Sequence, residues 1–244
     1  MKAKPVKKLD PEAPLVENAA RIVRVRLDEM RSFAPAALRP DGATQQHDLR
    51  IAAKRLRYVL EVTGFCFGRP ADTARRRARE IQGVLGELHD CDVMLPRVAG
   101  HVERLRDDDA KAVRARAGDA KDLDPALVAR APHRTAYRGL ELLAVHVEAR
   151  RALLFDRFVG LWGELERTGT WERLERTIER KRREAQKCVD RLNELLAEVT
   201  HIGCEIKGVE EGLIDFRCER DGRIVYLCWR LGEDRITHWH DLDT

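Results

Sequence analysis

Aromatic residues are scarce in this sequence: they make up 5% of the 244 residues, whereas charged residues make up 36%. This composition, with many Ala, Leu, Arg and Glu residues, favours helices over sheets. No apolar run approaches the roughly 20 residues that a membrane span needs, and the basic segment 1–13 is not followed by the hydrophobic stretch of a secretory signal. We therefore expect a mainly helical, cytoplasmic protein with no membrane contact.

Cysteine pairs and nucleotide-binding motifs are missing as well. The six cysteines are scattered without a CxxC pair, which predicts reduced thiols in a cytoplasmic protein. The sequence also has no glycine-rich phosphate loop and no cluster of acidic metal ligands. We therefore expect no cofactor, no bound metal and no catalytic residues.

Apolar residues with helical spacing predict five helices, at about 14–33, 44–67, from 71 to beyond 90, 134–168 and 171–199. The polar stretch 107–133 is expected to be a solvated connection with at most a short helix. Amphipathic helices of this length form antiparallel bundles. We therefore expect three parts: a basic tail at 1–13, a helical bundle at 14–170 and a C-terminal module at 171–244.

The C-terminal module changes character after Gly203, where alternating apolar residues predict strands. Asp221-Gly222 is a strong hairpin signal, and a two-residue turn there pairs Arg220 with Arg223. Residues 235–240 could add a third strand. The predicted fold class is therefore mainly α: an antiparallel helical bundle followed by a helix and a small antiparallel β hairpin or meander.

This module also contains residues that could ligate zinc, namely Cys204, Cys218, Cys228, His238 and His240. In the predicted register, Cys218 and Cys228 lie on opposite faces of the hairpin, which argues against a disulfide and against a joint zinc site. An acid–base pair of Glu233 and His240 is a further alternative. The simplest interpretation is that Trp229, Trp239 and the apolar strand face pack on the fifth helix.

Positive charge is concentrated in residues 47–79, where nine Lys and Arg residues occur with three acidic ones. At about 100° per residue, one arc beside the apolar stripe of the second helix contains His47, Arg50, Lys54, Arg57, Tyr58 and Glu61, with Arg55 on its flank. Such cations repel one another unless carboxylates or a polyanion supply the opposite charge. Acidic residues four positions away are nearly absent, which favours a polyanion over an ordinary solvated helix face.

Two other helices contribute features of the same kind. In the third, Arg75, Arg79, Gly83 and Gly86 fall roughly opposite the apolar stripe, and glycines there let a ligand or a backbone approach closely. In the fourth, Arg151 falls within the apolar stripe and must find an anion. Glu61 and Asp90 are its candidate partners, and a contact with ligand stays open.

The segments HDLRIAAKRLRYVLE (47–61) and IQGVLGELHDCDVM (81–94) resemble the motifs of the CHAD family, the conserved histidine α-helical domain. The resemblance extends over about 14–170. It implies a helical bundle whose basic surface binds inorganic polyphosphate, in some members on polyphosphate granules. The residues that the motif implies for binding are His47, Arg50, Lys54, Arg55 and Arg57. Helical geometry adds Arg75, Arg76 and Arg79, and we include Arg151 as the cation of the fourth helix.

The resemblance also marks what this chain lacks. Family members usually carry the motif twice, and the single copy here suggests a homodimer that rebuilds the repeated arrangement. TIERK (177–181) comes near the Glu-x-Glu-x-Lys signature of triphosphate-tunnel domains, but Thr177 replaces the first Glu within a helical pattern, so we expect no triphosphatase activity. Residues 208–241, with GLIDF and LCWRLGE, resemble an uncharacterised bacterial domain family that implies no activity.

The expected function is therefore non-enzymatic binding of inorganic polyphosphate. RNA binding is the first alternative, although the basic face offers only Tyr58 for base stacking. An accessory enzyme that processes phosphate compounds is the second alternative.

Overall fold

The computed structural model describes residues 2–11, 13–201, 204–210, 213–220, 223–230 and 238–241. The chain divides into two compact units: one comprises Met1–Asp10 and Arg21–Arg176, the other Pro11–Ala20 and Thr177–Thr244. The protein is mainly helical, as predicted. None of the described helices is both long and apolar enough to cross a bilayer.

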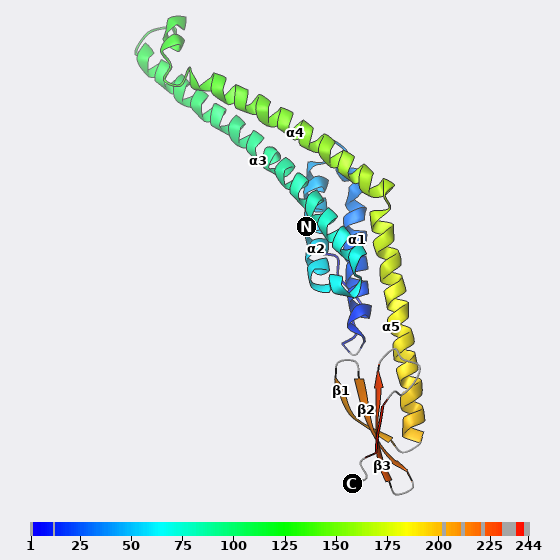
Figure 1. Ribbon diagram of the computed structural model, residues 1–244. Helices are drawn as coiled ribbons and strands as arrows, with labels where there is room; N and C mark the ends of the chain where they lie inside the picture. Colours follow the sequence, from blue (N-terminus) through cyan, green and yellow to red (C-terminus); the bar gives the residue numbers. More distant parts are fainter. Residues whose placement is uncertain are drawn as a thin grey trace. The chain divides into compact units, whose positions relative to one another are not determined.

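The helices are α1 (Leu15–Ala37), α2 (Ala43–Thr63), α3 (Arg69–Ala117), α4 (Ala136–Arg167) and α5 (Thr170–His201), as Figure 1 shows. Two short 3₁₀ helices, η1 (Gly64–Cys66) and η2 (Pro125–Arg130), lie in the connections. The strands are β1 (Cys204–Glu210), β2 (Leu213–Arg220), β3 (Arg223–Arg230) and β4 (His238–Asp241).

The core of the first unit is a helical bundle. The apolar stripes of the helices supply its fully buried side chains, among them Leu27, Leu56, Leu85, Phe158 and Trp171. Burying one such side chain contributes about 1.5–3 kcal/mol. On α2 the buried stripe combines Leu49, Leu56 and Leu60 with the small residues Ala52 and Ala53, which let a neighbouring helix pack closely beside it.

Two helices are longer than the sequence predicts. α1 continues through Pro35 to Ala37, and α3 continues through Pro96 to Ala117. The prediction that 107–133 is a connection was therefore wrong for its first part. A proline inside a helix removes one backbone hydrogen bond, and the stretch after Pro96 is rich in Ala and Arg, which are strong helix formers.

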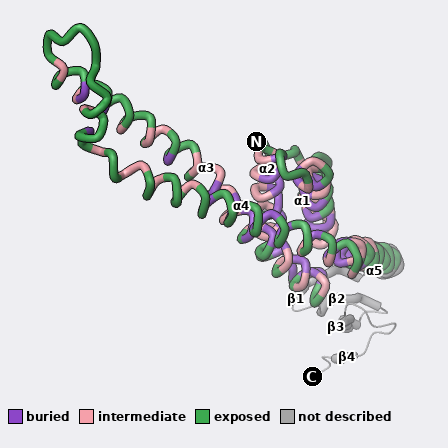
Figure 2. Tube along the Cα trace, turned by 90° about the horizontal axis from the view of Figure 1, so that it is seen from above, coloured by how far each residue is buried: buried purple, intermediate pink, exposed green. Residues whose placement is uncertain are grey.

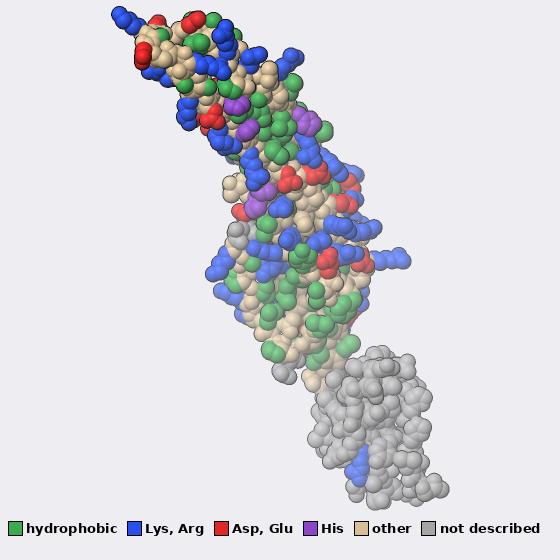
Figure 3. Space-filling model, turned by 90° about the vertical axis from the view of Figure 1, so that its left-hand side faces the viewer, with side chains coloured by type: hydrophobic (Ala, Val, Ile, Leu, Met, Phe, Trp, Pro, Cys, Tyr) green, Lys and Arg blue, Asp and Glu red, His purple; other side chains and the backbone are tan. Residues whose placement is uncertain are grey.

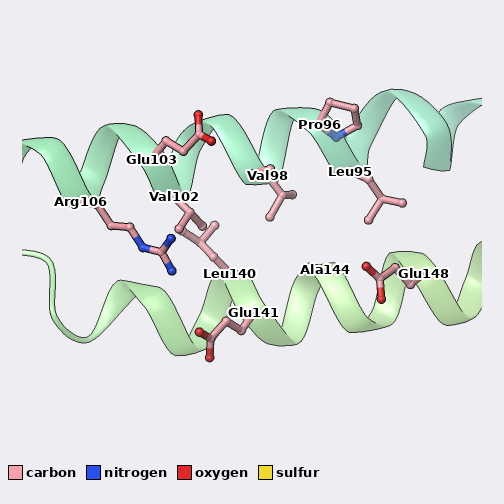
Figure 4. A pocket seen from close by; sticks show the side chains of 11 residues that line it. Leu95, Pro96, Val98, Val102, Glu103, Arg106, Leu140, Glu141, Ala144 and Glu148 are labelled. Carbon is pink, nitrogen blue, oxygen red and sulfur yellow. The ribbon is translucent and has the colours of Figure 1, made fainter.

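Beyond the core, α3 and the first half of α4 run side by side (Figures 1 and 2). A groove of about 440 Å³ lies between them and is lined mainly by apolar side chains, including Leu95, Val98, Val102 and Leu140 (Figure 4). Three of its four charged lining residues are acidic, Glu103, Glu141 and Glu148, and the fourth is Arg106. An apolar groove with this edge does not suit an anion.

A buried carboxylate holds the far end of these two helices together. Asp109 accepts hydrogen bonds from the backbone N–H of His133 at 3.0 Å and from the Tyr137 hydroxyl at 2.7 Å. Burial raises the pKa of Asp109, but these hydrogen bonds outweigh it and lower the pKa below its ordinary value. The carboxylate therefore fixes the return of the chain from η2 into α4.

The α4–α5 junction falls at the Thr-Gly-Thr sequence of 168–170. Gly169 has φ +60°, a left-handed conformation that favours glycine. The N–H groups of Thr168 and Gly169 donate to the carbonyls of Glu164 and Glu166, which closes the last turn of α4. The chain can then start α5 in a new direction, while the division between the two units lies inside α5.

The second unit contains an antiparallel sheet in the order β1-β2-β3-β4. Arg220 pairs with Arg223 between β2 and β3, and Tyr226 pairs with His240 between β3 and β4. The Asp221-Gly222 turn and Glu233 lie outside the described residues. So do the side chains on which the predicted zinc site, acid–base pair and tryptophan packing depend. Among the described side chains, Cys66, Cys91 and Cys188 are free thiols.

Candidate anion-binding site

The candidate site is the seam between α2 and α3, two antiparallel helices joined by the short connection at 64–68. We define the α2–α3 seam by His47, Arg50, Lys54 and Arg57 of α2 and by Arg75, Arg79, Gln82, Gly86 and His89 of α3. Spacings of three and four residues align each set along its helix. The seam therefore runs parallel to the helix axes beside the buried stripe.

Two contacts fix the register across the seam. The imidazole rings of His47 and His89 have centroids 4.6 Å apart. Nε of Arg50 lies 3.6 Å from the position that a Cβ atom on Gly86 would take. Continued along the antiparallel helices, this register brings Lys54 level with Gln82 and Arg57 level with Arg79. The structure thus gathers cations from both helices along one line.

Several buried polar atoms along the seam have no hydrogen-bond partner within the described part of the chain. They are Nδ1 of His47, Nε of Arg50, Nε of Arg57 and Oε1 of Gln82. Leaving a buried donor unpaired costs about 1–3 kcal/mol. The two guanidinium N–H groups are therefore unsatisfied donors in the free protein.

The charges along the seam are only partly neutralised. Within the described residues, Arg50, Lys54 and Arg79 of the seam have no carboxylate at ion-pair distance, and neither has Arg76, an exposed α3 residue that is not part of the seam. Arg57 lies 3.5 Å from Glu61, and Arg75 lies 3.9 Å from Asp72, which are long, half-exposed pairs. Figure 3 shows Lys and Arg side chains gathered on the face of the helical unit seen there. The seam is consequently a surface of excess positive charge.

The aromatic ring beside the seam is already covered by cations. The guanidinium carbon of Arg57 lies 4.5 Å and Nζ of Lys54 lies 5.7 Å from the centroid of the Tyr58 ring. Such contacts attract the cations to the ring face and hold them in place. They also occupy the ring that a nucleobase would stack on.

Arg55 does not lie on the seam. Its guanidinium donates to Oε1 of Glu29 on α1 at 2.9 Å, and the same carboxylate accepts from Arg26 at 2.5 Å and from the backbone N–H of Lys4 at 3.0 Å. Glu29 is only 4% exposed. Residues 50 and 55 are about 140° apart around the helix, so Arg55 faces α1 when Arg50 faces α3. The resemblance implied Arg55 as a binding residue, whereas its guanidinium is engaged inside the bundle.

Arg151 is paired as well, with a partner other than those expected. Its Nε lies 2.5 Å from Oδ1 of Asp92, and its terminal nitrogens donate to Oε1 of Gln46 and to the carbonyl of Pro40, each at 3.3 Å. The expectation of Glu61 or Asp90 as partner was wrong. The packing of α4 against α3 turns Arg151 toward Asp92. Arg151 therefore joins α4 to α3 and, through Gln46, to the start of α2.

His47 of the seam is sensitive to its surroundings. Burial lowers the pKa of His47 below its ordinary value, and the nearby His89 and Arg50 lower it further. Both causes disfavour the imidazolium form in the free protein. A bound anion would act in the opposite direction and favour protonation.

A cleft of about 350 Å³ between α3 and α4 adjoins the seam at Arg79. Its lining includes Arg79, Gly83 and Arg157 together with Glu80 and Glu87. Both carboxylates bind other arginines, since Glu80 pairs with Arg77 and Glu87 with Arg150. Among the described residues, Arg79 and Arg157 therefore remain unpaired in this cleft.

Sequence reasoning missed three of these residues. Gln82 and His89 could have been found by continuing the helical spacing from Arg75 and Arg79 along α3. Arg157 carried no such signal, because only the packing of α4 against α3 brings it beside Arg79.

Comparison with known families gives two matches. The family model described as CHAD domain matches residues 2–99, and the model described as uncharacterized conserved protein (DUF2203) matches residues 87–244. The two matches overlap within α3. No curated protein and no solved structure matches the chain. The first match covers every α2 and α3 residue of the seam.

Proposed function

Because the chain belongs to the DUF2203 family of uncharacterised conserved proteins and carries a CHAD domain in its first hundred residues, we propose that its α2–α3 seam binds inorganic polyphosphate without catalysing a reaction. CHAD domains are associated with binding of polyphosphate and triphosphate. The proposal assigns the contact to Arg50, Lys54, Arg57 and Arg79, with His47 at one end of the seam.

The observation that carries the proposal is the combination of unpaired charge and unpaired donors on one line. Arg50 has a buried Nε–H without an acceptor and, among the described residues, no carboxylate partner. Guanidinium groups bind phosphate oxygens through two parallel hydrogen bonds, which are stronger than neutral ones. A chain of phosphates would neutralise successive cations along the seam and satisfy these donors.

The linear form of the seam favours a linear anion. Successive α2 cations at 50, 54 and 57 are spaced by about one helical turn, or roughly 5–6 Å. A single phosphate would neutralise one end of this row and leave the repulsion at the other. A polymer with a negative charge on every unit matches the whole row.

Polyphosphate is favoured over RNA because the seam lacks free stacking surfaces. Sequence-tolerant binders of single strands stack bases on several aromatic rings. The imidazole rings of His47 and His89 in the seam lie against each other, and Arg57 and Lys54 lie over the ring of Tyr58 beside it. Polyphosphate has no bases, so this arrangement costs it nothing.

Titration with long-chain polyphosphate tests the proposal. The triple variant Arg50→Gln, Lys54→Gln, Arg57→Gln should lose binding. A matched triple variant in α5, Arg180→Gln, Arg183→Gln, Arg191→Gln, removes the same charge from residues that pair with Glu184, Glu179 and Glu194. It should bind as wild type does. Equal losses in both variants would mean that net charge, and not the seam, determines binding.

Two further measurements separate the alternatives. RNA that displaces polyphosphate at equal phosphate concentration would favour a nucleic-acid ligand. Release of phosphate over time, with divalent metal added, would reveal an enzyme. A labelled protein that follows polyphosphate granules in the cytoplasm, and loses them with the seam variant, would support the proposed location.

A further inference from the structure

The outer face of α4 is apolar although it points away from the core. Buried residues such as Leu154 and Phe158 form one stripe of this helix. On the other side, Leu142, Val145 and Leu153 are 62%, 62% and 69% exposed. Figure 2 shows that most of the tube along the first half of α4 is exposed. A helix that is apolar on both sides is normally buried on both sides, so a partner is expected to cover the outer face.

Helical periodicity aligns this outer face into one row. At about 100° per residue, an arc about 80° wide contains Arg138, Leu142, Val145, Ala149, Ala152 and Asp156. The two large apolar residues lie in the first half of the row and the two alanines in the second half. Small residues there let a second helix approach closely, as helix–helix packing requires.

The row fits a second copy of itself. Let two α4 helices lie antiparallel, with the two-fold axis at the level of position 147. Leu142 of one helix then meets Ala152 of the other, and Val145 meets Ala149. Each large side chain then faces a small one, which fills the contact without gaps. The fit occurs twice, as the two-fold symmetry of a dimer requires.

The same alignment also pairs charges. It places Arg138 opposite Asp156 at both ends of the row. Within the described part of the chain, neither residue has an ion pair or a hydrogen bond through its side chain. Both side chains are exposed in the monomer, and the dimer would place each beside a residue of opposite charge, which favours this register over others. A partner of unrelated sequence would have no reason to match both ends of the row.

From this complementarity we propose that the protein forms a homodimer through the outer faces of two antiparallel α4 helices. The contact runs for about 27 Å, the length of the helix from Arg138 to Asp156. One helix pair of this length buries less than a standard interface. The dimer is therefore expected to dissociate on dilution.

Sedimentation equilibrium of the full chain over a concentration series tests this. Wild type should change from 28.0 kDa toward twice that mass as concentration rises. Arg138→Asp and Asp156→Arg each place like charges opposite one another at both ends, so each should weaken the dimer at least about tenfold. The double variant restores opposite charges and should dimerise again. Val145→Gln, which changes no charge, should also weaken the dimer.

Glu166→Arg is the matched control, because it reverses one exposed charge of α4 outside the contact and should leave the dimer unchanged. Far-UV circular dichroism checks that each variant is helical. A monomeric wild type would overturn the proposal. So would single variants that dimerise as wild type does, or a helical double variant that stays monomeric.

Discussion

Arg50 and Arg55 lie five positions apart in one motif, and the structure predicts opposite effects of removing them. Arg50 lies on the α2–α3 seam with its Nε unpaired, whereas Arg55 binds the buried carboxylate of Glu29 at 2.9 Å. We expect Arg50→Gln to weaken polyphosphate binding with little effect on stability. Arg55→Gln should lower stability with little effect on binding.

The loss of polyphosphate affinity expected for Arg50→Gln follows from counterion release. For a single-stranded polyanion, log K falls with log salt by about 0.7 for each phosphate neutralised. Contacts from Arg50, Lys54, Arg57 and Arg79 therefore predict a slope of about −3, or a roughly 50-fold loss of affinity between about 50 and 200 mM salt. Arg50→Gln should reduce the slope by about 0.7 and weaken binding at low salt by at least about tenfold.

The loss of stability expected for Arg55→Gln follows from the burial of the Glu29 carboxylate. Glu29 is 4% exposed and accepts from both Arg26 and Arg55. Arg55→Gln leaves the carboxylate with Arg26, so the expected loss is about 1–3 kcal/mol in the free energy of unfolding, less than for a fully orphaned buried charge. The salt slope should stay at its wild-type value.

Calorimetric titration with long-chain polyphosphate at several salt concentrations measures affinity and slope, and urea denaturation measures stability. The reasoning is refuted if Arg55→Gln reduces the slope as much as Arg50→Gln does. It is also refuted if Arg50→Gln leaves both the affinity and the slope unchanged.

Three other predictions follow from single contacts. Gly86→Ala should stabilise α3 by up to about 1 kcal/mol, because the new methyl group lies in ordinary contact, 3.6 Å from Nε of Arg50. It should nevertheless weaken polyphosphate binding, because the methyl group takes space that a phosphate oxygen beside this nitrogen would need. A stable variant with unchanged affinity would contradict this. The affinity for polyphosphate should rise as pH falls through the titration of His47, whose pKa is lowered in the free protein by burial and by the nearby His89 and Arg50. The variant His47→Gln should flatten this pH profile. An equally steep profile in that variant would mean that the imidazole of His47 does not cause the pH dependence. The pKa of Asp109 is lowered in the fold, so its contribution to stability is present at neutral pH and is lost as pH falls through that pKa. The variant Asp109→Asn should melt at a lower temperature than wild type at neutral pH, and its melting temperature should change less on acidification. Thermal melts at several pH values would check this.

Local periodicity predicted much of the fold because apolar spacing is a property of neighbouring residues. Leu49, Leu56 and Leu60 are buried as their spacing on α2 requires, and the helix breaks at 38–42 and 168–170 follow from proline and glycine. The same rules failed at 107–117, where the polar composition predicted a connection and α3 continues to Ala117. Local composition could not show that α4 packs along the side of α3.

The composition and motif of the sequence determined that this protein is helical and that α2 presents a row of cations. Which cations are free was decided only by tertiary structure. The rotation of each helix about its axis and the register between helices depend on how distant apolar stripes pack together. That packing turns Arg55 toward Glu29, Arg151 toward Asp92 and Arg50 toward Gly86, because an ion pair between helices needs two residues far apart in the chain to face each other.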